Sequence, residues 1–186
     1  MKSIPLYLAL LLTACQSKDI TLQTVSLRTM EQEKVNGSEL FEGHISAITF
    51  LMPECPLSEN YCLTLNDMQM KYEQEGVDFI GVVAGDMFSM DEIDAFIDEY
   101  GLRIPVYRDK KKELVSLLGA TITPEVFLLD TAMHVMYSGA IDNWAVDLGR
   151  KREVITKFYL RDAVDALLEG RDIETSKTEA VGCFIE

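Results

Sequence analysis

One cysteine lies where a thiol is most easily made reactive. Cys55 follows an apolar run at residues 45–52 that predicts a buried strand, and it precedes Pro56 and a helical stripe of apolar side chains. Proline suits the first position of a helix, because a helix start leaves its N–H groups unpaired in any case. The other N–H groups and the positive end of the helix dipole stabilise the thiolate form of Cys55, whereas the negative charge of Glu54 opposes it. We interpret Cys55 as a nucleophile, with a small buried hydrophobic residue as the alternative.

Two other cysteines are candidate partners of Cys55. Cys62 is seven residues further on, so a continuous helix separates the pair by ~10 Å of rise, beyond the ~7 Å limit between the Cα atoms of a disulfide. We read Cys62 as a core residue, which acts as a partner only if the first helical turns unwind. Cys183 lies in an apolar island, residues 181–185, after a polar stretch long enough to fold back. It is either the resolving cysteine or a packed residue near the terminus.

The patterns around Cys55 predict a strand–helix–strand unit. The helix after Pro56 runs to about residue 74 and ends at Gly76, and residues 77–83 form a second strand that is apolar enough to be covered on both faces. Such a unit is a right-handed crossover between parallel strands. Cys55 therefore lies where a central strand turns into a helix.

The rest of the chain predicts further strands and helices. Before and after the unit we expect a weak edge strand at 20–27, one helical turn capped by Ser38 and ending at Phe41, and a helix that starts at a Ser89–Glu92 capping box and ends at Tyr100. We then expect an extended segment at 104–107, a helix at 110–118, a strand at 121–130, its hairpin partner at 133–138, a loop at 139–151, a helix at 157–168 and a polar tail.

Composition and charge limit the function. The 186 residues include 48% apolar side chains, which suits one domain with a full hydrophobic core. The formal net charge is −14, from 31 acidic and 17 basic residues. We expect no nucleic-acid binding, because phosphate contacts require lysine and arginine.

The first residues have the pattern of an export signal. Lys2 supplies a charge, and residues 4–12 are apolar but too short to span a bilayer. Leu12-Thr13-Ala14-Cys15 resembles a bacterial lipobox, in which the signal is cut before a cysteine that is then lipidated. The alternative is an ordinary secretory signal in which Cys15 is incidental. We expect a signal peptide at 1–14, a lipidated tether at 15–22, a domain at 23–175 and a tail at 176–186 that carries Cys183.

Export also sets the redox environment of the thiols. Disulfides form and persist outside the cytoplasm. Without Cys15 the chain has three cysteines, an odd number, so at least one stays free, pairs with another molecule or takes part in exchange.

The order of parallel unit, hairpin and closing helix resembles a thioredoxin fold. Two signatures agree in place: Cys55 at the first strand-to-helix turn and Thr123-Pro124 at the opening of a later strand. The resemblance implies an α/β single domain with a central mixed sheet flanked by helices, and a cis Pro124 that faces the reactive cysteine. Four segments narrow it, over about residues 23–186, to the redoxin group of the alkyl hydroperoxide reductase/thiol-specific antioxidant superfamily: Glu54–Tyr61, Thr123–Asp130, Tyr137–Asp142 and Thr178–Cys183.

Departures from related patterns narrow the chemistry. Ser58 stands where thioredoxins have their second cysteine, so their usual disulfide cannot form. Met52 stands where peroxiredoxins have the threonine that orients peroxide, and Thr49 lies three residues further back, which disfavours a peroxidase. A third relative, the copper-delivering assembly factor of cytochrome oxidase, has two cysteines four residues apart and a distant histidine. Cys55 and Cys62 are seven residues apart, so this pattern is absent as well.

Other polar residues are weaker candidates. His44 and His134 have no cysteine or carboxylate at ligand spacing, so we expect no metal site, and we expect no cofactor. Candidate general bases are Glu59 and Asp86, and candidates for the rim of a site are Asp142, Asn143 and Trp144.

We therefore expect a thiol-disulfide oxidoreductase that Cys15 tethers to a bacterial membrane, facing away from the cytoplasm. Cys55 attacks a protein or small-molecule disulfide, and Pro124 shapes the groove that holds the partner's segment. Cys183, or in second place Cys62, resolves the mixed disulfide. The alternatives are a thiol-dependent peroxidase, in which Cys55 passes through a sulfenic acid, and a non-enzymatic lipoprotein that keeps the fold as a binding module.

Overall fold

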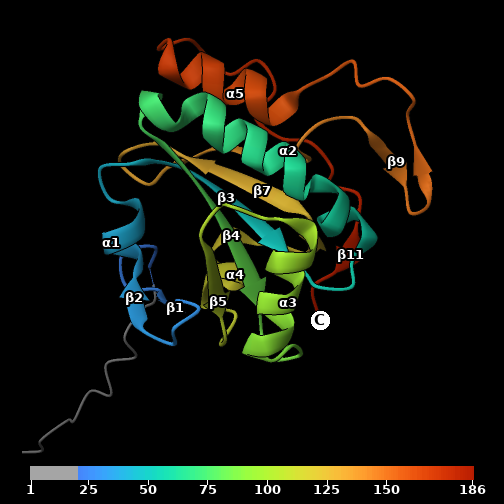
Figure 1. The fold of residues 1–186 in the computed structure, drawn as a ribbon. Coiled ribbons are helices and arrows are strands. Elements are labelled where there is room, and N and C mark those ends of the chain that lie inside the picture. Colours follow the sequence, from blue (N-terminus) through green and yellow to red (C-terminus); the bar gives the residue numbers. More distant parts are fainter. Residues whose placement is uncertain (1–20) are drawn as a thin grey trace, which may run out of the picture.

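Seven strands form one mixed sheet with helices on both of its faces (Figure 1). The computed structural model describes residues 21–186, so the predicted signal peptide and Cys15 lie outside the described residues. Within that range, no helix has the length and apolar character that a membrane crossing requires. The single mixed sheet with helices on both faces confirms the predicted thioredoxin fold. The strand order is β2 (Lys34–Asn36), β1 (Ser26–Arg28), β5 (Val106–Asp109), β4 (Val77–Ala84), β3 (Ile45–Leu51), β7 (Glu125–Leu129) and β8 (Val135–Gly139).

Parallel pairing lies at the centre of the sheet. β3 pairs in parallel with β4, and β4 with β5, whereas β7 runs antiparallel to β3 and β8 antiparallel to β7. The predicted strand–helix–strand unit consists of β3, α2 (Pro56–Tyr72) and β4, and this prediction is confirmed. A short 3₁₀ turn, η1 (Glu73–Glu75), and left-handed Gly76 end the helix.

Each face of the sheet has its own apolar core. Along β3, Ala47 and Leu51 belong to one core and Ile48 and Phe50 to the other, and all four are buried. The first core includes side chains of α2, α3 (Met90–Tyr100) and α5 (Tyr159–Leu168), and the second includes those of α1 (Gly37–Phe41) and α4 (Glu113–Leu118). Because both faces are covered, most side chains of β3 and β4 are apolar and buried rather than alternating between apolar and polar.

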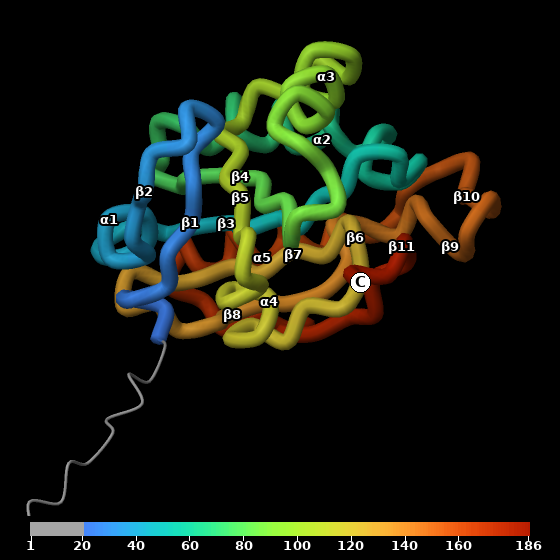
Figure 2. The backbone as a smooth tube through the Cα atoms, turned by 90° about the horizontal axis from the view of Figure 1, so that it is seen from below, coloured from blue at the N-terminus to red at the C-terminus, as the bar shows by residue number. Residues whose placement is uncertain are grey.

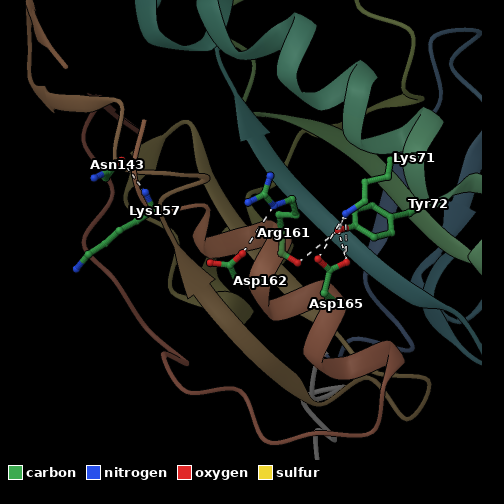
Figure 3. A network of polar contacts seen from close by, with 7 residues as sticks. All are labelled: Lys71, Tyr72, Asn143, Lys157, Arg161, Asp162 and Asp165. Carbon is green, nitrogen blue, oxygen red and sulfur yellow. Dashed lines mark hydrogen bonds and ion pairs between the residues drawn. The ribbon is translucent and has the colours of Figure 1, made fainter. Parts of the chain in front are cut away.

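A polar contact joins α2 to α5 (Figure 3). The Tyr72 hydroxyl donates a hydrogen bond to the Asp165 carboxylate, which also pairs with Lys71 at 3.3 Å. The Tyr72 ring stacks on Phe79 of β4, with 6.1 Å between the ring centroids. Burial and the Asp165 carboxylate raise the pKa of Tyr72, so the hydroxyl keeps its proton and remains a donor.

The amino-terminal strand prediction is wrong in place and extent. β1 starts at Ser26 and lies between β2 and β5, so the edge strand is β2. The two strands are three residues long and pair through Leu27 and Val35, too short for a readable period. The next element, α1, begins at Gly37 and takes Asn36 rather than Ser38 as its cap.

The predicted helix at 110–118 begins later than its pattern suggested. α4 starts at Glu113, because the buried Asp109 carboxylate accepts hydrogen bonds from the N–H groups of Glu113, Leu114 and Val115. The basic residues 110–112 therefore precede the helix rather than oppose its dipole. The start of α4 depends on a side chain from the preceding strand.

Two further segments differ from the prediction. The strand at 121–130 is divided into β6 (Ile122–Thr123) and β7, because Pro124 has no N–H group for the ladder. The predicted loop at 139–151 contains a projecting hairpin of β9 (Ala145–Asp147) and β10 (Arg150–Lys151), visible beside α2 in Figure 1. The Asn143 side chain closes the base of the hairpin by accepting hydrogen bonds from the N–H groups of Thr156 and Lys157, the second of which Figure 3 shows.

The contact between α2 and α5 leads to a stability prediction. Tyr72→Phe removes the hydroxyl donor to Asp165 and keeps the ring on Phe79, so we expect the free energy of unfolding to fall by about 1–2 kcal/mol. Chemical denaturation measures this change. The matched control is Tyr107→Phe, whose hydroxyl has no hydrogen-bond partner among the described residues and whose loss should cost less than ~0.5 kcal/mol. Equal losses in the two variants would contradict the role of the Tyr72 hydroxyl.

Candidate active site

Cys55 occupies the N-cap position of α2, at the turn that the sequence predicted. Its backbone is extended, its carbonyl accepts the first helical hydrogen bond from Glu59 at 3.0 Å, and Pro56 takes the first helical position. The side chain is buried. Glu54 has a left-handed backbone with φ of 64°, a conformation that costs a non-glycine residue about 1 kcal/mol and here turns the chain between β3 and α2.

The sulfur of Cys55 faces the segment that opens β7. Its Sγ donates a hydrogen bond to the Thr123 carbonyl oxygen at 3.3 Å, and the Thr123–Pro124 bond is cis. Thr123 and Pro124 are both buried. The cis geometry and its position next to Cys55 agree with what the resemblance implied.

The carboxyl-terminal tail returns to the segment that contains Thr123, and Figure 2 shows β11 (Cys183–Phe184) beside β6. β11 pairs antiparallel with β6, and Cys183 lies opposite Thr123. The Thr123 hydroxyl donates to the Cys183 carbonyl at 3.3 Å, and the Ile185 N–H group donates to the Thr121 carbonyl at 2.9 Å. This pairing places the Cys183 thiol beside that of Cys55, where each affects the pKa of the other, and both are free thiols. The role of Cys183 stays a prediction.

The pKa of Cys55 lies below the ordinary value of a thiol. Burial raises it and is the largest single influence, yet four hydrogen bonds together outweigh burial. The strongest comes from the Cys183 thiol, followed by the N–H group of Ser58, the hydroxyl of Ser58 and the N–H group of Leu57. The two N–H groups are unpaired donors of the start of α2, the source of activation expected from the sequence.

The other two thiols hold their protons more tightly. Burial, the hydrogen bond to Cys55, the charge of Cys55 and the charge of Glu59 together raise the pKa of Cys183 to about 12. Burial and Glu59 raise the pKa of Cys62 to about 11. Cys62 is fully buried and donates to the Ser58 carbonyl at 3.3 Å within the unbroken helix α2. The structure therefore brings Cys183, and not Cys62, into contact with Cys55.

Sequence reasoning missed the part of Ser58. Its hydroxyl accepts a hydrogen bond from the Met52 N–H group at 3.2 Å and donates to Cys55. Ser58 thus joins the end of β3 to the sulfur. The sequence did contain one signal for this role. Ser58 follows the N-cap Cys55 by three residues, a spacing at which a helical side chain lies on the same face as the cap residue.

The predicted rim residues hold the projecting hairpin on α2. The Tyr61 hydroxyl donates to Asp142 at 2.6 Å, and the same carboxylate oxygen accepts the Trp144 N–H group at 2.8 Å. The Trp144 ring meets the Tyr61 ring edge to face, with 5.5 Å between centroids. These residues contact the second turn of α2 rather than Cys55.

The remaining candidates lie in different surroundings. Asp86 lines a cleft of about 340 Å³ that also includes Met52, Lys112, Thr123 and Ile185, at the carboxyl ends of β3 and β4. Each histidine pairs with one carboxylate, His44 with Asp78 and His134 with Asp130, and both are exposed. Among residues 21–186, no group of three or more histidine, cysteine or carboxylate side chains is placed to hold a metal ion.

The mixed sheet, the helix that starts at Cys55 and the cis Thr123–Pro124 bond define a protein of the thioredoxin-fold class. The model of the AhpC/TSA family matches residues 15–138, and the chain belongs to this family. The family assignment predicted from the four segments is therefore confirmed.

Comparison with individual proteins supports the same class. The thiol-disulfide oxidoreductases ResA of Bacillus anthracis and Bacillus thuringiensis are each 29% identical to the chain over 105 residues. The match covers 54% of this chain and 57% of each relative, so the chain spans little more than half the length of these curated relatives.

Solved structures extend the likeness over most of the chain. A hypothetical protein from Sinorhizobium meliloti is 25% identical and superposes with a TM-score of 0.74. The superposition covers 90% of this chain and 94% of that one. A secreted disulfide oxidoreductase from Mycobacterium tuberculosis has a TM-score of 0.53 at 16% identity and covers 61% of this chain and 81% of its own. The second likeness shows the fold alone.

The hydrogen bonds around Cys55 predict how its reactivity with thiol reagents depends on pH. A lowered pKa leaves more thiolate at neutral pH, so alkylation of Cys55 should proceed at pH values where Cys62 and Cys183 are inert. Mass spectrometry of labelled peptides across a pH series measures each midpoint. Cys183→Ala should raise the midpoint of Cys55, because the strongest donor is lost, whereas Cys183→Ser keeps a donor and should raise it less. An unchanged midpoint in Cys183→Ala would contradict this account.

Proposed function

We propose that the chain is a thiol-disulfide oxidoreductase in which Cys55 is the nucleophile and Cys183 the resolving cysteine. The observation that carries the proposal is the meeting of the two thiols at the start of α2, where the pKa of one is lowered and that of the other raised. The activity in the names of the ResA relatives supports the same chemistry.

The reaction proceeds by two displacements. The Cys55 thiolate attacks one sulfur of a client disulfide, a mixed disulfide forms, and the other client sulfur leaves as a thiolate. The Cys183 thiolate then attacks the sulfur of Cys55 and releases the second client thiolate. Two electrons pass to the client, and the chain holds a Cys55–Cys183 disulfide. The same steps in reverse oxidise a client dithiol.

The opposed pKa values give the two displacements an order. While Cys55 is a thiolate, Cys183 donates a hydrogen bond to it and keeps its own proton. A mixed disulfide removes the charge of Cys55, so two of the influences that raise the pKa of Cys183 disappear. Cys183 is then easier to ionise at the step that requires its thiolate.

Pro124 has a positioning role in this proposal. It is buried and follows Thr123, whose carbonyl contacts the sulfur of Cys55 and whose backbone pairs with Cys183. In this proposal a client segment bound at Cys55 would lie against this backbone. The proposed clients are protein segments or small molecules that carry a thiol or a disulfide.

The thiol chemistry is tested with single substitutions. Cys55→Ser should abolish disulfide exchange on a small reporter, whereas Cys62→Ser should retain most of the activity, because Cys62 is buried without contact to Cys55. Cys183→Ser should leave the first displacement intact and accumulate mixed disulfide, which mass spectrometry detects. Equal losses in Cys55→Ser and Cys62→Ser would contradict the assignment. Rapid consumption of hydroperoxide by the unaltered protein would favour a peroxidase, and a Cys55 inert to thiol reagents a binding module.

We also propose that Cys15 carries a lipid and tethers the domain to a membrane outside the cytoplasm. The lipobox-like segment Leu12–Cys15 supports this proposal. A single change at the cysteine should therefore separate anchoring from folding.

Cys15→Ala should leave the protein without lipid and move it from the membrane fraction to the soluble fraction. Membrane fractionation and the intact mass of the protein measure the two effects. Ser17→Ala is the matched control and should remain in the membrane fraction. A Cys15→Ala protein that still sediments with membranes would contradict the anchor.

A further inference from the structure

Gly182, the residue before Cys183, lies against the backbone of β6. A Cβ atom at this position would stand 1.9 Å from the Thr123 carbonyl oxygen, 2.6 Å from the Thr123 carbonyl carbon and 2.9 Å from Cγ2 of Ile122. The two shortest contacts are with backbone atoms, which cannot rotate away. No other amino acid fits at residue 182 while β11 stays paired with β6.

The requirement for glycine here is one of space and not of backbone freedom. Gly139 and Gly76 have positive φ values, whereas Gly182 does not. An alanine could therefore adopt the backbone of residue 182 in an open tail. Its methyl group would prevent only the close approach to Thr123.

The tail is held independently on both sides of Gly182. Before it, the Thr178 N–H group donates to the Ser138 carbonyl at 3.0 Å, and the Thr178 hydroxyl oxygen accepts the Ala140 N–H group at 2.9 Å. After it, the Ile185 N–H group donates to the Thr121 carbonyl. A side chain at residue 182 would therefore lift the segment around Cys183 while the root of the tail stayed attached at Thr178.

We propose that Gly182 is a positioning residue for thiol exchange, because its missing side chain lets β11 close on Thr123 and sets Cys183 against Cys55. The inference rests on the proposed function, in which these two cysteines form the exchanging pair. The quantity that it controls is the effective concentration of one thiol at the other.

Equilibration with glutathione measures this quantity in the full chain. Formation of the Cys55–Cys183 disulfide releases two electrons and two protons, which reduce one oxidised glutathione to two reduced molecules. The fraction of the bonded peptide pair, read by mass spectrometry across glutathione ratios, gives the effective concentration. Gly182→Ala should lower it about tenfold or more, because small displacements of reacting groups reduce intramolecular rates and equilibria steeply.

The matched control is Phe184→Ala, because Phe184 lies on the other side of Cys183 and its side chain is 74% exposed. This variant should equilibrate like the unaltered protein. A second measurement follows the opening of β11 directly: hydrogen exchange of the Ile185 amide should be faster in Gly182→Ala and unchanged in Phe184→Ala. A third is the alkylation midpoint of Cys55, which should rise only in Gly182→Ala.

The outcomes separate the two proposals. If the unaltered chain forms a Cys55–Cys183 disulfide and Gly182→Ala forms it equally well, the role of Gly182 is overturned and the proposed function stands. If the unaltered chain forms no such disulfide at any glutathione ratio, the resolving role of Cys183 fails, and the positioning role fails with it.

Discussion

The carbonyl group of Thr123 is the point on which the arrangement of the site depends. It accepts a hydrogen bond from Cys55, and its residue pairs with Cys183 across the β6–β11 ladder. The position of this carbonyl is fixed by the core of the sheet. β7 begins directly after Pro124 and pairs with β3, with Glu125 opposite Phe50, so the end of one strand and the start of the other bring Thr123 to Cys55. Three segments that are far apart in the sequence therefore meet at one residue, Thr123.

The two cysteines of α2 show how hydrogen-bond direction decides thiol chemistry. Both are buried, and burial alone raises the pKa of each. Each thiol donates to a carbonyl, Cys62 to that of Ser58 and Cys55 to that of Thr123, but only Cys55 also receives hydrogen bonds from the N–H group and hydroxyl of Ser58. One residue thus stabilises the neutral form of one sulfur and the ionised form of the other. The start of the helix supplies donors, and its interior supplies only an acceptor.

Long elements with a clear period could be predicted from the sequence, and short elements could not. β3, α2 and the capping box at Ser89–Glu92 lie where the patterns placed them. The start of α4 depends on the Asp109 carboxylate, and β1, β2, β9 and β10 are too short to show a period. The sequence context also predicted the positions of Cys55 at the start of α2 and of Pro124 at the opening of β7, whereas their roles stay predictions. The return of Cys183 stayed open, because a two-residue ladder depends on a contact between Gly182 and Thr123 that no local pattern encodes.

The separation of Cys55 and Cys183 along the chain has a consequence for chains that lose the tail. Cys55 and the start of α2 lie in the first half of the sequence, whereas Cys183 lies in the tail. In the proposed reaction, a chain without the tail keeps the nucleophile and lacks the resolving cysteine, so a client captured by Cys55 is released only by another thiol. Under that proposal, loss of this segment would convert an exchange site into a thiol trap, and the truncated chain would be held covalently on its clients.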